Sequence, residues 1–524
     1  MPLDFKRELH VSRLKHVDVW DIIIIGGGAT GLGVALDAAS RGYSTLLLEQ
    51  SDFAKATSGR STKLVHGGVR YLAQGNIKLV YTALHEREIL FRNAAHLIKR
   101  QSFIIPCFNL LTRLKYFIGL KIYDLLAGSF SFGRSKVLNV KQVKQLLPGI
   151  NYKNLKGGIE YFDGQFDDAR LAVNLAQTCS EHGATVINYC RVTGLLKVNN
   201  KICGVSFLDN ESKQHYELNA KVVVNATGVF VDDILKMDKP ERKPLVKPSQ
   251  GTHIVFPNSF LNGSSALMIP KTSDGRVLFA IPWYGHLLVG TTDTPLNNSS
   301  LEPKALKKEI HFIIETLEKY WINAPGEKDI LSVFAGLRPL AAPQKNTGST
   351  KEISRDHKLL VSASGLVTIT GGKWTTYRKM AEETMDAAIK AGNLKPVICL
   401  TKNIKIHGCS NTESKNHLSI YGSDEENIKQ LIKENPFFGN KLIDKLPYTV
   451  AEVIWAVRNE MARTIEDVLA RRIRILFLDA KAAIEAAPEV AEIMAEELNY
   501  NEDWKTSQLN DFRILAEGYL AGVD

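Results

Sequence analysis

The stretch from Asp21 to Glu49 constrains the fold more than any other part of this 524-residue chain. Four isoleucines follow Asp21, and the next residues fit the pattern G-x-G-x-x-G at Gly26, Gly28 and Gly31. We expect a buried strand, a tight turn at Gly26, a helix start near Gly28 that faces a pyrophosphate, and close helix packing at Gly31. Glu49 ends a second apolar run and is placed to bind a ribose. Since strand, helix and terminal acid are all present, the pattern predicts a dinucleotide site, without separating FAD from NAD.

Chain length and net charge limit the classes of protein to which this sequence can belong. A chain of 524 residues is too long for one core, so we expect two or three domains. The 66 basic residues exceed the 56 acidic ones, and the net charge of +10 favours an anionic partner. A phosphorylated substrate, an acidic membrane surface and nucleic acid all fit. The six cysteines form no CxxC pair and no metal-binding spacing, which predicts reduced thiols and no metal site.

The compartment is predicted from apolar runs and from the first residues. The start, MPLDFKRELHVSRLKHVDVW, is charged and carries acids, unlike a secretory signal or a mitochondrial transit peptide. No apolar run reaches the roughly 20 residues needed to cross a bilayer. We expect a cytoplasmic protein, or one attached to a membrane from its cytoplasmic side.

Residues 96–130 are unusual in composition. Large apolar and aromatic residues alternate there with Arg113, Lys115 and Lys121, and no acidic residue occurs between Gln101 and Asp124. Such a pattern is typical of a helix that lies in a membrane interface. A buried hairpin with basic residues reaching the surface is the alternative. We favour the membrane helix because aromatic residues and cations are interleaved.

The remaining patterns predict an α/β protein with several segments. A polar, glycine-containing loop, 51–71, suits contact with a ligand. Residues 184–229 indicate a β meander, and about 245–340 an antiparallel sheet that walls a substrate cavity. Residues 367–392 predict a strand, a glycine turn and a helix. The pattern from about 447 is helical, basic and amphipathic.

Several longer motifs carry a resemblance that covers nearly the whole chain. They are TSGRSTKLVHGGVRYL (57–72), NATGVFVDD (225–233), GTHIV (251–255), VGTTDTP (289–295), GLRPL (336–340), SRDH (354–357) and GGKWTTYR (371–378). By these motifs the chain resembles FAD-dependent glycerol-3-phosphate dehydrogenase, the respiratory, quinone-reducing enzyme. It differs from the mitochondrial branch in lacking a transit peptide and a calcium-binding loop, which implies a bacterial-type enzyme without calcium regulation.

The resemblance and the segments together predict three domains. A discontinuous Rossmann-like FAD-binding domain comprises residues 1–95, 145–240 and 345–400. A substrate or cap domain with an antiparallel sheet comprises 96–144 and 241–344, including the segment 96–130. A C-terminal helical domain comprises 401–524. Its helices are equally suited to forming a homodimer, covering the active site or stabilising the chain.

The substrate implied by the resemblance is glycerol 3-phosphate, oxidised to dihydroxyacetone phosphate. Arginine forks bind phosphate through directional, bidentate hydrogen bonds. By resemblance, Arg70 and Tyr71 line the substrate pocket with Arg338, Arg355 and Lys373. A surface ion pair with Asp356 is the strong alternative for Arg355. That alternative is weaker for Arg338, because an unpaired cation in an apolar run is costly to bury.

A base is needed for the hydroxyl proton, and His253 is our first candidate because histidine titrates near neutral pH. By resemblance it faces the flavin, although a core histidine is the alternative from its residue type alone. His66 competes, but the resemblance assigns it to the flavin-binding loop. A third option has no dedicated base, with Arg338 and Lys373 lowering the pKa of the alcohol.

The resemblance implies FAD as the cofactor, which would accept the hydride that protein side chains cannot. Gly26, Gly28 and Gly31 are expected at the pyrophosphate and Glu49 at the ribose. The resemblance places Thr62, Lys63, Leu64, His66, Gly67 and Gly68 at the flavin ring, Ala226 and Gly228 near the adenine half, and Gly372, Lys373 and Thr375 at the ring's polar edge.

The expected electron acceptor is a membrane quinone, so the protein is expected at the inner face of the plasma membrane, on an anionic lipid surface. The nearest rival is a glycerol-3-phosphate oxidase that uses oxygen, and another rival oxidises an amino acid or a different hydroxy acid. A flavin-dependent RNA-modifying factor is disfavoured because basic residues are dispersed and no nucleic-acid recognition module is evident. A non-enzymatic membrane scaffold leaves the His, Arg and Lys motifs without a purpose.

Overall fold

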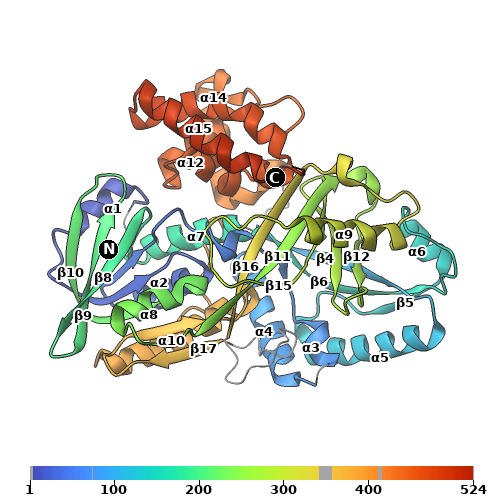
Figure 1. Cartoon of the computed structure of the whole chain (residues 1–524), viewed down its shortest axis with the longest axis horizontal. Helices are drawn as coiled ribbons and strands as arrows, with labels where there is room; N and C mark the ends of the chain where they lie inside the picture. Colours follow the sequence, from blue (N-terminus) through green and yellow to red (C-terminus); the bar gives the residue numbers. More distant parts are fainter. Residues whose placement is uncertain (1–3, 74, 342–356, 411–415, 523–524) are drawn as a thin grey trace.

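The computed structural model describes residues 4–73, 75–341, 357–410 and 416–522, and arranges them as two sheets beneath a helical part (Figure 1). The first sheet has the order β17-β18-β10-β1-β2-β7, with β8 and β9 as an antiparallel extension of β10. Its central strands are parallel. The strands are β1 (Val19–Ile25), β2 (Thr45–Leu48), β7 (Thr185–Ile187), β8 (Cys190–Val198), β9 (Lys201–Asp209), β10 (His215–Asn225), β17 (Lys358–Val361) and β18 (Val367–Thr370).

The isoleucine run forms β1 and is buried on both faces, as the sequence predicts. Ile22 and Ile24 pack into the core that contains helices α2 (Ala29–Ser40), α7 (Asp168–Glu181) and α10 (Tyr377–Ala391). Ile23 and Ile25 pack on the other side, with residues of β8, β9 and helix α8 (Val231–Asp238). Successive side chains of a strand point to opposite faces, so an unbroken apolar run fits a sheet covered on both sides.

The second sheet is mostly antiparallel, in the order β15-β11-β14-β13-β12-β4-β6-β3, with β16 beside β11 and β5 beside β6. Within this second sheet, β4 and β12 are the only described strands that pair in parallel. The strands are β3 (Leu64–Val65), β4 (Ile98–Pro106), β5 (Lys136–Leu138), β6 (Gly158–Phe166), β11 (Val246–Pro257), β12 (Ala266–Ile269), β13 (Leu278–Trp283), β14 (His286–Gly290), β15 (Thr294–Pro295) and β16 (Ser332–Ala341). Helix α6 (Val140–Leu146) and helix α9 (Lys307–Tyr320) flank this sheet.

Two segments lie elsewhere than the sequence predicts. Residues 145–166, expected with the FAD-binding strands, contain β6, which pairs along its whole length with β4 of the second sheet. The expected membrane segment 96–130 is not one helix, because its first part is the strand β4. Only α5 (Leu110–Ala127) is helical there, beginning at an Asn109 cap and lying at the lower edge of the molecule beside α3 (Val69–Ala73) and α4 (Ile77–Asn93) (Figure 1).

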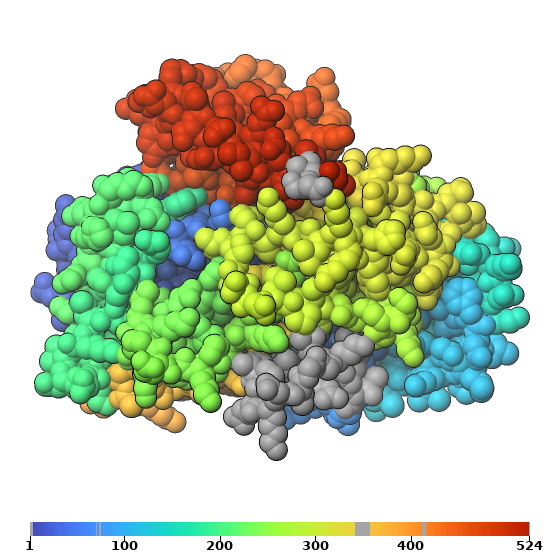
Figure 2. Space-filling model, viewed as in Figure 1, coloured from blue at the N-terminus to red at the C-terminus, as the bar shows by residue number. Residues whose placement is uncertain are grey.

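The C-terminal part is helical and shares cores with both sheets. Figure 2 shows it, in orange and red, pressed against the body of the molecule. Its apolar core includes Val255, Leu288 and Phe334 of the second sheet, whereas Tyr421 and Ile428 join the core of the first. The helices are α11 (Glu425–Glu434), α12 (Val450–Asn459), α13 (Ile475–Leu478), α14 (Ala480–Leu498) and α15 (Glu502–Glu517), with a π-helical turn at Asp467–Arg472.

Candidate active site

A cavity of about 900 Å³ lies where the two sheets meet. Its wall includes Gly26 and Glu49 at the ends of β1 and β2, and His253 and Arg338 on β11 and β16 of the second sheet. This volume lies within the usual range of ligand and cofactor sites, roughly 300–1,000 Å³. The cavity therefore joins the predicted dinucleotide motif to the predicted substrate residues.

The glycine motif leaves space only for backbone. Gly26 has a φ of 108°, and a Cβ on it would lie 2.8 Å from the carbonyl oxygen of Ala226. A Cβ on Gly31 would lie 1.8 Å from the carbonyl oxygen of Gly26, so α2 packs directly on the turn. Gly28 is the N-cap of α2. Free N–H groups at such a helix start attract anions, so this end of the cavity fits a pyrophosphate.

Ser58 and Glu49 complete this end. The hydroxyl of Ser58 accepts a hydrogen bond of 2.9 Å from the Ala29 amide at the start of α2. The Glu49 carboxylate accepts bonds from the amides of Gly27, at 2.6 Å, and Ser51, at 2.9 Å, while burial raises its pKa. Glu49 thus braces the glycine turn as well as lining the cavity, and its bond to a ribose remains a prediction.

Ala226 and Gly228 line the same region. The Ala226 amide donates to Ile25 O at 2.9 Å, which holds the end of β10 beside the end of β1. Gly228 has a φ of 60°, a left-handed conformation that glycine adopts without strain. Arg191 and Thr193 of β8 also face the cavity here, although no sequence motif singled them out.

His253 is a neutral, buried histidine in the opposite wall. Its ring stacks on Phe334, with centroids 4.9 Å apart, and its Nε2 lies 2.9 Å from the hydroxyl of Thr62. Burial, followed by the charges of Lys63 and Arg338, holds its pKa well below the usual value. The ring therefore carries no charge at neutral pH and is able to accept a proton.

Two predicted cations lie in the same cavity. Arg338 donates to the Thr291 hydroxyl at 3.0 Å and approaches Asp293, whose oxygen is 3.4 Å away. Lys373 Nζ lies 3.8 Å from the ring centroid of Tyr71. The cavity is lined by Arg338, Lys373 and Tyr71, all three of which the sequence analysis predicted for the substrate pocket. Arg70 belongs to α3, but its side chain, like the whole of Arg355, lies outside the described residues.

Most of the predicted flavin-contact residues line the cavity, namely Thr62, Leu64, His66, Gly68, Gly372 and Thr375. Two do not. The Gly67 amide donates to the Tyr123 hydroxyl at 2.9 Å, on the side of helix α5. The side chain of Lys63 is fully buried and bonded to Asp168, so it is not available to a ligand.

Asp168, which the sequence did not single out, holds the cavity loop in place. Its carboxylate accepts hydrogen bonds from Lys63 Nζ at 2.7 Å, from the Ser61 amide at 2.9 Å and from Arg474 at 3.1 Å. Burial alone would raise the pKa of Asp168, but the charges of Lys63 and Arg474 outweigh it and lower that pKa. These bonds fix the residues on both sides of Thr62. The acidic pair in FDDAR is the only sequence signal for this role.

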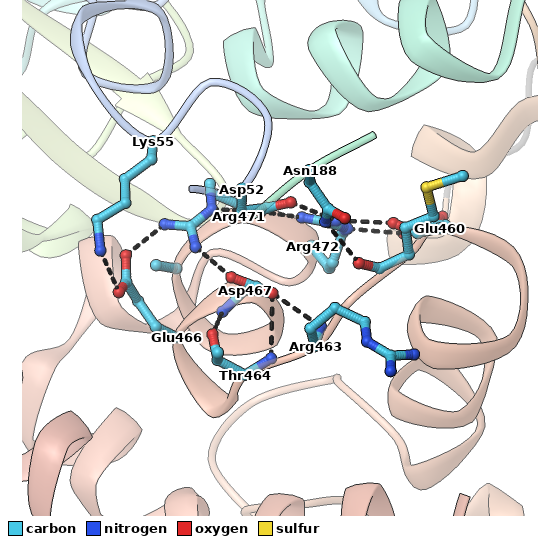
Figure 3. Close-up of polar contacts among 12 residues, drawn as sticks. Asp52, Lys55, Asn188, Glu460, Arg463, Thr464, Glu466, Asp467, Arg471 and Arg472 are labelled. Atoms are coloured by element: carbon cyan, nitrogen blue, oxygen red, sulfur yellow. Dashed lines mark hydrogen bonds and ion pairs between the residues drawn. The ribbon is translucent and has the colours of Figure 1, made fainter. Parts of the chain in front are cut away.

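A second buried carboxylate fastens the start of the loop to the C-terminal part (Figure 3). Asp52 accepts hydrogen bonds from Arg471 at 2.5 Å and from Arg472 at 2.6 Å. Arg471 also pairs with Glu466, and Glu466 with Lys55 of the loop. The C-terminal part therefore anchors the loop that forms part of the cavity wall, although none of its described residues lines the cavity itself.

The fold and the cavity are those of a flavin-dependent oxidoreductase, and comparison with known proteins agrees. Residues 21–378 match the family model for FAD dependent oxidoreductases, and residues 364–505 match the model for the C-terminal domain of alpha-glycerophosphate oxidase. The solved structure of glycerol-3-phosphate dehydrogenase from Bacillus halodurans, complexed with FAD, is similar over 99% of both chains, with a TM-score of 0.81 and 28% identity.

Characterised relatives narrow the family further. The mitochondrial glycerol-3-phosphate dehydrogenase of Arabidopsis thaliana is 39% identical over 96% of this chain and 86% of its own length. The human mitochondrial enzyme is 38% identical over 97% of this chain and 74% of its own length. The chain therefore belongs to the FAD-dependent glycerol-3-phosphate dehydrogenases, as its motifs predicted.

We expect Asp168→Asn to lower the free energy of unfolding by about 3–5 kcal/mol, because it removes the carboxylate that pairs with the buried side chains of Lys63 and Arg474. Denaturant unfolding measures the effect. Glu497→Gln is the control, since Glu497 pairs with Arg458, whose side chain is 47% exposed, and its loss should cost less than about 1 kcal/mol. Equal costs for the two variants would contradict the role given to Asp168.

Proposed function

We propose that this protein oxidises sn-glycerol 3-phosphate to dihydroxyacetone phosphate with bound FAD and passes the electrons to a membrane quinone. The observation that supports this best is a single cavity with a glycine-lined helix start at one end and a neutral histidine with two cations at the other. Membership of the family supports the same substrate and cofactor.

The residues present fit FAD. The glycine turn leaves space only for backbone, and α2 begins at the cavity with amides suited to a pyrophosphate. We assign Gly26 and Gly28 to the pyrophosphate, with Gly31 packing α2 against the turn, Glu49 to the ribose, and Ala226 and Gly228 to the adenine half. Thr62, Leu64, His66, Gly68, Gly372 and Thr375 would hold the ring. Bound FAD supplies the hydride acceptor that no side chain provides.

His253 is proposed to take the hydroxyl proton at Nε2, the nitrogen beside Thr62 at the cavity wall. Its depressed pKa keeps it unprotonated and makes it a weak base. A weak base suffices, because the hydroxyl becomes strongly acidic as the hydride leaves the adjacent carbon. The alternative in which Arg338 and Lys373 lower the pKa of the alcohol acts in the same direction, so the two proposals add.

Arg338 and Lys373 are proposed to bind the phosphate, together with Arg70 and Arg355, while Tyr71 is proposed to line the same pocket. The Arg338 guanidinium is already oriented by Thr291 and Asp293, so binding costs it little conformational entropy. Asp293 forms an ion pair with this guanidinium at 3.4 Å and also accepts a hydrogen bond from Ser249.

The acceptor and the membrane contact are proposed from helix α5. Its outward face carries an apolar stripe, with Leu111 and Leu125 77% and 79% exposed. The stripe comprises Leu110, Leu111, Leu114, Ile118, Ile122 and Leu125. Phe117 turns inward and packs on a core, so it is unsuited to test this contact. Lys115 and Lys121 lie on the same helix and suit anionic headgroups.

A protein that reduces a lipid-soluble quinone must touch the membrane. The proposed contact through α5 therefore supports quinone over oxygen as the acceptor. It also supports attachment at the inner face of the plasma membrane. Among the described helices, none is long and apolar enough to cross a membrane. The relatives from Arabidopsis thaliana and human are mitochondrial enzymes. Reduction of a quinone analogue, compared with peroxide formation, decides the acceptor. A homodimer and the absence of a nucleic-acid partner stay predictions.

Anaerobic mixing of the FAD-loaded protein with glycerol 3-phosphate should bleach the flavin absorbance, whereas glycerol and lactate should not.

We expect Arg338→Lys to lower kcat/KM for glycerol 3-phosphate by roughly tenfold to a hundredfold, since lysine keeps the charge but loses the bidentate fork. Bleaching by glycerol at a similar rate, or an unchanged kcat/KM in Arg338→Lys, would contradict the proposal.

The double variant Leu111→Glu/Leu125→Glu should weaken binding to vesicles of anionic lipid by more than about tenfold, because it removes two apolar side chains from the proposed contact. Sedimentation with vesicles measures it. Ile398→Glu/Ile514→Glu is the matched control, with the same charge change at residues 79% and 62% exposed on other elements. Equal loss in both variants, or in neither, would count against α5 as the contact.

A further inference from the structure

The inner face of α5 is bonded to the loop that lines the cavity. Tyr123, 2% exposed, lies on this face, opposite the apolar stripe. Its hydroxyl accepts a hydrogen bond of 2.9 Å from the Gly67 amide and donates one of 2.7 Å to Asp163. One phenol therefore joins the helix to the loop.

Asp163 is a buried residue of β6 that also lines the cavity. Its other oxygen accepts a hydrogen bond of 2.6 Å from Arg87 of helix α4. Arg87 donates in turn to the carbonyl of Phe130, just after α5, at 2.9 Å. Burial and the charge of Asp163 raise the pKa of Tyr123 well above its usual value, so the phenol stays protonated and keeps donating.

The loop packs tightly at Gly67 against helices α5 and α4. A Cβ on Gly67 would lie 2.5 Å from the Tyr123 hydroxyl and 2.6 Å from a methyl group of Leu84. The neighbours of Gly67, His66 and Gly68, both line the cavity, and Gly68 lies against the ring of Tyr71. A small movement of α5 would thus move the phenol, the Gly67 amide and the cavity wall together.

We propose that Tyr123 is a positioning residue that couples contact of α5 with a lipid surface to the His66–Gly68 loop of the cavity. The outer face of the helix meets the bilayer, and the inner face sets the loop. The inference rests on the proposed membrane contact. It predicts that docking on a bilayer changes the environment of the flavin.

The test uses the FAD-loaded protein, vesicles of anionic lipid and the variant Tyr123→Phe. Wild-type protein should sediment with the vesicles, and its flavin fluorescence should change when they are added. Tyr123→Phe should sediment equally well but show no such change. Without vesicles it should lose FAD about tenfold faster, because Asp163 and the Gly67 amide each lose a buried partner.

Tyr421→Phe is the matched control, since the Tyr421 hydroxyl is also buried and donates to Glu452, away from the cavity. It should leave FAD loss and the response to vesicles unchanged. A vesicle response in Tyr123→Phe equal to that of the wild type would overturn the inference. So would wild-type protein that sediments with vesicles without any change in flavin fluorescence. Wild-type protein that does not sediment would overturn the membrane proposal, and the coupling with it.

Should Tyr123→Phe fail to fold, hydrogen exchange of residues 64–72 in the wild-type holoenzyme decides the question. Exchange in this peptide should change when vesicles are added. Unchanged exchange in protein that is fully bound to vesicles would overturn the coupling.

Discussion

The shape of the cavity depends on the hydrogen bonds and ion pairs of the buried Asp168 carboxylate. This carboxylate is the counterion of Lys63 and Arg474 and also accepts the Ser61 amide, so one side chain fixes the loop on both sides of Thr62. Thr62 in turn holds the ring of His253. A buried pair of this kind contributes little net stability when intact but is costly to break, so its main effect is to specify one geometry for the loop.

The C-terminal part also anchors this loop. Arg474 reaches Asp168, and Arg471 and Arg472 reach Asp52 at the start of the loop. The loop from Asp52 to Lys63 is therefore anchored to the helical C-terminal part as well as to the sheet that carries the dinucleotide motif. On its other side the loop is bonded to Tyr123 of α5. The cavity wall thus lies between the C-terminal part and the proposed membrane helix.

Much of the fold could be predicted from the sequence, because its signals are local. The isoleucine run, the glycine turn at Gly26 and the strand-turn-helix at 367–392 all form as expected, since their periodicity and glycine positions dictate them. The strand β4 within 96–130 was missed, because an apolar run with basic residues suits a strand and a helix equally. The pairing of β6 with β4 is a long-range choice that no local pattern records.

The site was predictable where a motif marks it and not where tertiary contacts build it. His253, Arg338 and Lys373 meet in one cavity as the resemblance implied. The residues that hold the neighbouring loop in place, among them Asp168 and Tyr123, lie far away in sequence and carry ordinary residue types. Lys63 illustrates the difference, because its motif suggested a flavin contact whereas its side chain is buried on Asp168.

The most direct test of this account is hydrogen exchange of residues 57–72 in protein stripped of FAD. The chain itself satisfies the amides of Ser61, Lys63 and Gly67, through Asp168, the Ser61 hydroxyl and Tyr123. We therefore expect slow exchange in this loop before FAD is added, and little further slowing afterwards. Rapid exchange that slows only when FAD binds would show that the cofactor, and not the buried carboxylate, builds the cavity.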